Sequence, residues 1–338
     1  MTDSTPLVSL RQVTKHFPVR TSFLAPPSGW VHAVDGVDID IAEGEILGLV
    51  GESGCGKSTL VRTLLDLTKP TSGTVHFEGK DLSTLSRLQR KELRRRAQIV
   101  FQDPVGALDP RMTVRQTVSE GLDVHRVGVR TERQHKVERI LARVGLGAEC
   151  LDRFPHEFSG GQRQRIGIAR ALVLEPRFLV LDEPVSALDV SVQSQVLNLL
   201  VELQKEMNLT YLFVAHNLAV VAYIADRVAV MYLGKIVELA DSRRLYERPL
   251  HPYTVALLAA VPQVGSNGER RPSLVLQGEA ASPASHPAGC HFRARCPLAQ
   301  PICEQEEPPL VELAPGHRVA CHFAGQPISV PDKAPAAS

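Results

Sequence analysis

The segment Gly51–Ser58 constrains the fold of this chain more than any other feature of its sequence. It fits the pattern G-x-x-x-x-G-K-[ST], follows the short apolar run Ile46–Val50 and precedes an apolar-periodic stretch, Thr59–Leu67. Such a pattern binds phosphate between a buried strand and a helix, because glycines let consecutive backbone N–H groups face the phosphates and the helix N-terminus adds positive charge. The motif therefore predicts a nucleotide-binding α/β domain.

Each part of this loop has a distinct expected role. Lys57 is expected to neutralise the β- and γ-phosphate oxygens, and the Ser58 hydroxyl to ligate Mg²⁺. Cys55 suits the loop as a small filler. The residues that we expect to surround ATP here are Gly51, Ser53, Gly54, Cys55, Gly56, Lys57, Ser58 and Thr59.

Two acids follow the apolar run Phe178–Leu181. A buried strand would deliver Asp182 to the edge of the sheet, where it would hold Mg²⁺ directly or through water. Glu183 would then orient and polarise the attacking water as a general base. An Asp-Glu pair after a strand is by itself more typical of a solvated loop, and it is the phosphate loop that favours the catalytic interpretation.

Apolar runs recur along the chain at Gln98–Phe101, Phe178–Leu181 and Tyr211–Ala215, with helical patterns between them. The clearest helix covers Ser191–Met207. This alternation predicts a mostly parallel sheet covered on both faces. Residues 112–175 break the alternation with consecutive helices and no strand, which predicts an inserted α-helical subdomain.

The two ends of the chain have different patterns. Residues 8–50 alternate apolar and polar positions, as β-strands do, with a loop expected over Thr21–Trp30. Arg227–Tyr232 and Lys235–Leu239 flank Leu233 and Gly234, which predicts a terminal β-hairpin. Residues 263–289 are rich in Pro, Gly, Ser and Ala and predict a linker or irregular extension, and residues 324–338 predict a disordered tail.

Charge and hydropathy narrow the class of protein. The 338 residues carry 38 basic and 37 acidic side chains, a net charge of +1 that lacks the basic footprint of a nucleic-acid-binding protein. We find no apolar run of the ~18 residues that a bilayer span needs, and no signal-peptide pattern near Met1. We expect a cytosolic chain that reaches a membrane only through a partner.

The segment Phe158-Ser159-Gly160-Gly161-Gln162, together with the two motifs above, resembles the ATP-binding-cassette (ABC) family. The signature loop of that family is Leu-Ser-Gly-Gly-Gln, and Phe158 replaces the leucine. Ser159 would cap a helix whose exposed amides at Gly160 and Gly161 make an anion site. The resemblance implies that this loop closes over ATP held by an opposite subunit, in a head-to-tail dimer with two shared sites.

Other elements of the family follow in order. Gln102 is similar to the glutamine that contacts Mg²⁺, Ser186–Asp189 to the loop that passes between subunits, and His216 to the histidine that contacts the γ-phosphate. Phe17 is similar to the aromatic residue that stacks on adenine, although an aromatic in a strand-rich segment is often plain core. The resemblance implies an α/β fold: a P-loop NTPase (RecA-like) core with an antiparallel β subdomain, the helical insert and an irregular Cys-rich C-terminal extension.

Within that family, Glu183–Ser191 and Pro249–Thr254 resemble the dipeptide/oligopeptide importers, in particular their second ATPase subunit. This implies a cassette over residues 1–262 and an importer-type extension over 263–338. It also implies a sister ATPase subunit (a homodimer being the alternative), two transmembrane permease subunits contacted through Asp103–Met112, and an external solute-binding protein. The subunit would lie peripherally on the cytoplasmic face of the membrane. Nickel or another small solute is the alternative cargo.

The extension contains four cysteines, Cys290, Cys296, Cys303 and Cys321. Thiols stay reduced in the cytosol, so disulfides are not expected. Four thiolates suit either Zn²⁺ or a [4Fe–4S] cluster, although the spacing lacks the tight C-x₂-C pairs common in zinc sites. Several relatives with this tail are known to hold such a cluster, and from this resemblance we favour it over zinc or unmetallated thiols. We interpret His291 and His322 as bystanders.

Two rival functions come from other classes of ABC protein. A soluble ABC ATPase that acts on nucleic acid or ribosomes usually has two cassettes or a basic surface, and this chain has one phosphate loop and near-neutral charge. An exporter subunit would not require the importer-type tail. We therefore predict an ATP-hydrolysing importer subunit that does not bind nucleic acid.

Overall fold

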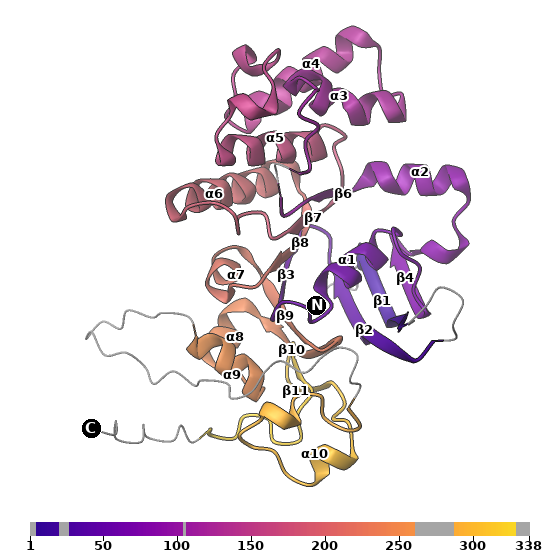
Figure 1. Ribbon diagram of the computed structural model, residues 1–338, viewed down its shortest axis with the longest axis vertical. Helices are drawn as coiled ribbons and strands as arrows, with labels where there is room; N and C mark the ends of the chain where they lie inside the picture. The colour runs from indigo at the N-terminus through magenta and orange to yellow at the C-terminus, as the bar shows by residue number, and fades with distance from the viewer. Residues whose placement is uncertain (1–4, 20–26, 104–105, 261–286, 329–338) are drawn as a thin grey trace, which may run out of the picture. The chain divides into compact units, whose positions relative to one another are not determined.

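The computed structural model describes residues 5–19, 27–103, 106–260 and 287–328 (Figure 1). The chain forms two compact units and passes between them several times. The first unit comprises Met1–Val13, Asp38–Gly48 and Val61–Ala215, and the second comprises Thr14–Val37, Leu49–Leu60 and His216–Ser338. The elements divided between the units are β1 (Val8–Val19), β2 (Gly29–Ile41), β3 (Ile46–Val50) and α1 (Lys57–Leu64).

Parallel strands form the core of the first unit. They are β6 (Ala97–Val100), β7 (Phe178–Asp182) and β8 (Thr210–Ala215), with β7 between the other two. In the register, Val180 pairs with Ile99 on one side and with Leu212 on the other. All of β8 and all of β7 except Asp182 are buried, as expected for a parallel sheet covered on both faces. The predicted strands are confirmed, except that Phe101 lies beyond β6 and is exposed.

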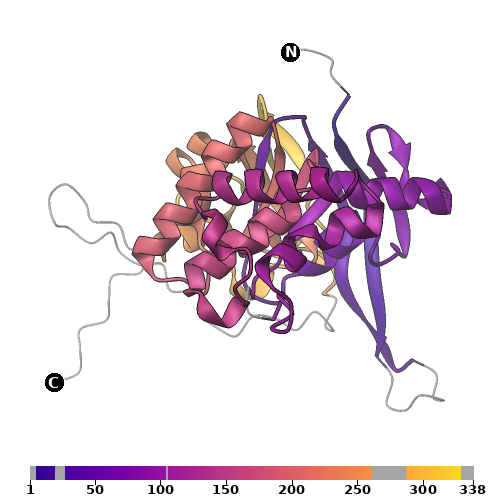
Figure 2. The same cartoon turned by 90° about the horizontal axis from the view of Figure 1, so that it is seen from above.

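Between β6 and β7 the described chain is helical. Figures 1 and 2 show α3 (Val114–His125), α4 (Arg130–Arg143) and α5 (Gly160–Leu172) as one group, and α3 packs against both of the others. Two 3-10 turns, Ala148–Cys150 and Pro155–Glu157, separate α4 from α5. Side-chain capping boxes begin α3 at Thr113 and α5 at Ser159, which satisfies backbone donors at the helix starts. The predicted helical insert over residues 112–175 therefore contains no strand.

The first unit also contains two short antiparallel strands, a 3-10 turn and two further helices. Strands β4 (Ser72–Phe77) and β5 (Lys80–Asp81) are antiparallel and belong to a sheet with the order β2-β1-β4-β5. A 3-10 turn (Leu82–Thr84) and α2 (Arg87–Arg96) follow. Helix α6 (Val190–Met207) begins at the cap Asp189 and ends at Asn208, whose φ of 48° is the left-handed conformation typical of helix ends.

The second unit contains antiparallel strands. Strands β9 (Arg227–Tyr232) and β10 (Lys235–Asp241) form the predicted hairpin, but this hairpin is not terminal. β10 also pairs with β12 (His317–Val319), and β12 pairs with β11 (Val311–Ala314). The prediction that the extension is irregular is therefore wrong over these residues. Most of β10 is buried, so the backbone N–H and C=O groups along its outer edge need hydrogen-bonding partners. Strand β12 of the extension supplies them.

Where the structure describes the second unit, four further helices and one 3-10 turn follow. The helices are α7 (Leu218–Ile224), α8 (Ser242–Glu247), α9 (Pro252–Ala259) and α10 (Ile302–Gln305), and the turn covers Arg293–Arg295. Among the described residues, every helix is too short or too polar to span a bilayer. The predicted linker falls mostly outside the described residues, as do most of the Thr21–Trp30 loop and the C-terminal tail. Gly29 and Trp30, predicted as loop, belong to β2.

Candidate active site

The phosphate loop lies in the second unit, between β3 and α1. Lys57 is buried, and its ammonium group donates to the carbonyls of Gly51 at 2.7 Å and Glu52 at 3.0 Å. Gly56 has a φ of 111°, and a Cβ at this position would lie 1.9 Å from the carbonyl oxygen of Ala33. Only glycine combines that backbone conformation with such a close approach. The loop is therefore folded around its lysine.

The other loop residues differ in exposure. Ser53, Gly54 and Ser58 are exposed, whereas Thr59 is half-buried. Cys55 is buried; burial raises the pKa of its thiol, and the neighbouring Lys57 offsets part of that rise. The thiol is thus protonated at neutral pH and fills space within the loop.

Phe17 belongs to the second unit and to β1. Its side chain is 40% exposed, and the ammonium group of Lys15 lies 5.0 Å from the centre of its ring. A ring this exposed is not plain core. It is open to stacking on one face, which is the property needed to hold a planar base.

The predicted carboxylates lie in the first unit, at the C-terminal end of β7. Asp182 is the last residue of the strand, and Glu183 follows it with a φ of 49°. The amide of Glu183 donates to the carbonyl of Val214 at 3.0 Å, which holds this left-handed residue beside β8. Non-glycine residues with positive φ are uncommon and gather at functional sites.

Gln102 is brought to Glu183 although the two are far apart in sequence. Its amide Nε2 donates to Glu183 Oε2 at 3.0 Å, from an exposed position just after β6. From the sequence we expect both residues to take part in ATP hydrolysis, and this hydrogen bond joins them within the first unit. His216, the remaining catalytic candidate, is the exposed residue directly after β8 and belongs to the second unit.

The signature segment begins α5 in the first unit. Ser159 Oγ accepts from the amide of Gln162 at 3.3 Å, and the Gln162 side chain accepts from the amide of Ser159 at 3.0 Å. A Cβ at Gly161 would lie 2.4 Å from Val192 Cγ1, so this helix start packs closely on α6. Phe158 is buried, whereas Ser159, Gly160 and Gln162 are exposed. The segment therefore presents the N-terminus of a helix to solvent.

The four cysteines of the extension all belong to the second unit. Burial is the main cause of a raised pKa at Cys290, at Cys296, where it reaches about 12, and at Cys321, where it reaches about 11. Neighbouring thiols of the group add to each rise, so the side chains lie close enough to interact. The bare thiols of Cys290, Cys296 and Cys321 are protonated at neutral pH, and a bound metal would be needed to hold them as thiolates.

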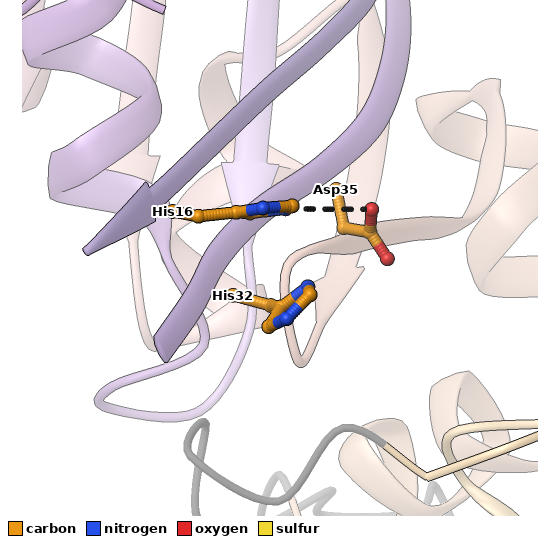
Figure 3. Close-up of side chains that lie close together, drawn as sticks. All are labelled: His16, His32 and Asp35. Atoms are coloured by element: carbon orange, nitrogen blue, oxygen red, sulfur yellow. Dashed lines mark ion pairs between the residues drawn. The ribbon is translucent and has the colours of Figure 1, made fainter. Parts of the chain in front are cut away.

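A cluster that the sequence did not predict joins His16, His32 and Asp35 in the second unit (Figure 3). Their candidate ligand atoms all lie within 4.8 Å of one another, and the two imidazole rings are 3.9 Å apart between centres. Asp35 also has partners outside the cluster. The Lys235 ammonium group lies 2.9 Å from its carboxylate, and its backbone amide donates to the carbonyl of Gly234 at 2.9 Å. These contacts hold β2 against the β9–β10 turn, and we assign the cluster that structural role.

Comparison with known proteins finds two matching families and many similar chains. The family described as ABC transporter matches residues 34–186, and the family described as oligopeptide/dipeptide transporter, C-terminal region, matches residues 237–303. The chain is 54% identical over 319 residues to the oligopeptide transport ATP-binding protein AppF of Bacillus subtilis, covering 94% of this chain and 97% of that protein. It is 50% identical over 317 residues to a putative peptide import ATP-binding protein of Brucella ovis, covering 94% and 98%.

Solved structures give the same result for the fold. The structure of cbiO1 from Clostridium perfringens, part of the ABC transporter complex cbiONQ, has a TM-score of 0.63 and 31% identity, covering 72% of this chain and 92% of that one. A dimeric post-hydrolysis state of the ATP-binding cassette MJ0796 with ADP and Pi has a TM-score of 0.62 and 29% identity, covering 70% and 99%. From these matches, the chain belongs to the ATP-hydrolysing cassette subunits of ABC transporters, in the branch that carries the oligopeptide/dipeptide transporter C-terminal region.

Proposed function

We propose that this chain binds and hydrolyses ATP to drive the import of peptides through a membrane transporter. The observation that carries the proposal is the 54% identity, over 94% of the chain, to an oligopeptide transport ATP-binding protein. The match of residues 237–303 to the oligopeptide/dipeptide transporter region supports the same cargo. We divide the chain functionally into a cassette over residues 1–262 and an extension over 263–338.

We propose that the phosphate loop binds the triphosphate and that Phe17 stacks on adenine. The loop backbone supplies N–H donors, and Lys57 supplies a charge that is already directed into the loop by its bonds to Gly51 and Glu52. The exposed hydroxyl of Ser58 is available at the start of α1. What supports this role is the left-handed glycine geometry, which leaves the loop backbone open to an anion.

Hydrolysis is assigned to the first unit's carboxylates, with His216 contacting the γ-phosphate. Oxygen donors at Ser58, Gln102 and Asp182 suit Mg²⁺, which would neutralise charge on the β- and γ-phosphates. Glu183 would accept a proton from the attacking water, and the Gln102 amide would hold its carboxylate in place through the 3.0 Å hydrogen bond. The positive φ of Glu183 supports a role for which the backbone is specially shaped.

The signature segment is assigned to ATP held by another subunit. Ser159, Gly160, Gly161 and Gln162 begin α5, and the partial positive charge of that helix start suits a phosphate. A related cassette was solved as a dimer with ADP and Pi, which supports this arrangement. We propose a sister ATP-binding subunit as the partner, so that each chain supplies half of two sites.

The remaining partners follow from the family. We propose that two transmembrane permease subunits contact the region Asp103–Met112, of which Pro104 and Val105 lie outside the described residues. An external solute-binding protein would deliver the peptide. The chain would then lie on the cytoplasmic face of the membrane as a peripheral subunit.

The test is phosphate release by the assembled transporter in proteoliposomes, with and without peptide-loaded binding protein. We expect peptide to stimulate release, and Glu183→Gln to reduce the stimulated rate to half or less, because a lost base slows its own site by about 10²- to 10⁴-fold. Glu175→Gln is the matched control: Glu175 also has a positive φ, 54°, but pairs with Lys136 at 2.9 Å. If the rate of phosphate release does not change when peptide is added, peptide is not the cargo. If Glu183→Gln has the wild-type rate, Glu183 is not the general base.

We further propose that Cys290, Cys296, Cys303 and Cys321 hold a [4Fe–4S] cluster. A single tetrahedral Zn²⁺ with bonds of ~2.3 Å needs sulfurs about 3.8 Å apart. Among the described residues, the histidine–aspartate group of Figure 3 is the only set of three or more whose ligand atoms lie within 4.8 Å of one another, so no three of these thiols are that close. A [4Fe–4S] cluster also takes four thiolate ligands, and it would supply four iron–thiolate bonds to a part of the chain with little regular structure.

Iron and acid-labile sulfide in anaerobically purified protein test the cluster. We expect about four of each per chain, lost when Cys303→Ser and Cys321→Ser are combined. Purified protein that contains zinc, or neither iron nor sulfide, would contradict the proposal. The result would not affect the assignment of ATP hydrolysis.

A further inference from the structure

The phosphate loop is bound to the cysteine segment (residues 287–323) by one bidentate ion pair. Arg295 Nη1 donates to Glu52 Oε2 at 2.7 Å, and Nη2 donates to Oε1 at 3.0 Å. The two residues are 243 positions apart, yet both belong to the second unit. The Arg295 side chain is 8% exposed and that of Glu52 is 28% exposed. A parallel fork of this kind is the strongest geometry for an arginine–carboxylate pair.

Aromatic side chains fix both partners of this pair. The Arg295 guanidinium lies 6.0 Å from the ring centre of Tyr232, and the amide of Glu52 donates to the hydroxyl of Tyr253 at 2.9 Å. Phe292, three residues before Arg295, is buried against both tyrosines at 5.2 and 5.5 Å between ring centres. The pair is therefore part of a packed core and is not a loose surface contact.

The chemical reason for this arrangement is charge. Glu52 is the second residue of a loop that must receive a triphosphate, and a bare carboxylate there would repel the phosphates. Arg295 cancels that charge and holds the carboxylate in one orientation. Its position directly before Cys296 means that the fold of the cysteine segment sets where the guanidinium lies.

We propose that Arg295 is a positioning residue for ATP binding, and that through it the cysteine segment controls the affinity of the phosphate loop. The inference rests on the proposed role of the loop. Arg295 touches no substrate; it acts through Glu52. Disorder in the cysteine segment, or loss of a group bound there, releases Glu52 and weakens nucleotide binding without any change in the loop's own sequence.

The experiment measures the affinity of the full chain for a fluorescent ATP analogue with Mg²⁺, beside its melting temperature. We expect Arg295→Gln to weaken binding by about tenfold, because the uncompensated Glu52 carboxylate then repels the phosphates. The double variant Glu52→Gln/Arg295→Gln regains most of the affinity, because it removes the uncompensated carboxylate. In the assembled transporter, Arg295→Gln raises the KM for ATP and leaves kcat within about twofold.

Arg293→Gln is the matched control. Arg293 lies in the same segment, but its guanidinium bonds only to the backbone carbonyls of Ala288 and Cys290 among the described contacts. We expect its affinity for ATP to be unchanged. If both arginine variants weaken binding equally, the effect is general loosening of the segment and the proposal is wrong.

Two other outcomes separate this proposal from the assignment of the loop. Lys57→Ala should abolish binding; if the wild-type chain itself does not bind the nucleotide, the loop assignment fails first. If the wild type binds, Lys57→Ala does not, and Arg295→Gln binds as the wild type does, only the role of Arg295 is refuted. A double variant that binds more weakly than Arg295→Gln alone also refutes it.

Discussion

At the scale of single residues, we expect the phosphate loop to need glycine at position 56 more than at position 54. Gly56 and Gly54 both have positive φ, 111° and 80°. A Cβ at Gly56 would lie 1.9 Å from the Ala33 carbonyl, whereas a Cβ at Gly54 meets nothing within 4 Å. Substituting Gly54 would therefore test backbone strain alone, whereas substituting Gly56 would add a steric collision.

We predict that Gly56→Ala weakens ATP binding by at least about tenfold and lowers the melting temperature, because the loop or β2 must move to avoid the collision. Gly54→Ala should cost only the left-handed strain, about 1–2 kcal/mol, and retain binding. Calorimetric titration with ATP and thermal unfolding of both variants check this. Equal losses at the two positions would mean that the contact with Ala33 is unimportant.

The residues that sequence could predict are those whose chemistry is local. Gly51–Ser58 is contiguous and identified by its spacing, and Ser159–Gln162 is contiguous and identified by its resemblance to the signature loop of the family. The capping box at Ser159 follows from the residue types. The pairing of Glu52 with Arg295 could not be predicted. A contact between residues 243 positions apart is set by tertiary packing, and no periodic pattern connects them.

At the scale of elements, the extension is joined to the cassette through a buried polar centre. Glu238 in β10 is fully buried and accepts from the amides of Leu250 at 2.8 Å and His251 at 3.0 Å. His317 in β12 places its Nε2 2.7 Å from the same carboxylate. Apolar patterning predicted β9 and β10 correctly. It did not predict β11 and β12, because β11 is exposed or half-buried along its length and the hairpin is short.

His251 gives this region a dependence on pH. Burial lowers the pKa of His251 to about 4, and Glu238 opposes that shift. The neutral ring accepts from the Tyr253 amide at 3.0 Å and so caps α9. Between pH 6.5 and 4 the unfolded chain binds a proton that the folded chain does not. Stability is therefore complete above pH 6.5 and falls as pH drops toward 4, by up to about 3 kcal/mol.

Denaturant unfolding of the wild type and His251→Asn between pH 4 and 8 measures this effect. Asparagine can cap α9 but does not titrate, so the variant should lose less stability on acidification. The difference between the two curves isolates His251 from the carboxylates that titrate in the same range. Parallel curves would show that His251 is not held neutral by the fold.

At the scale of the whole molecule, the chain carries two elements that we propose to bind phosphate, each at the start of a helix. The phosphate loop begins α1 and the signature segment begins α5. The sequence order of the motifs was sufficient to predict the family and the α/β fold. It could not decide what the cysteines hold, because four thiols suit more than one metal.

The central claim is that ATP joins this chain to a second ATP-binding subunit, each completing the site of the other. Light scattering of Glu183→Gln, purified with its companion subunit, measures this directly, because ATP then binds without being consumed. We predict that the measured mass rises from one ATP-binding chain to two on addition of ATP and Mg²⁺, and returns to one when ATP is removed. A mass that stays at one chain in saturating ATP and Mg²⁺ would contradict the account.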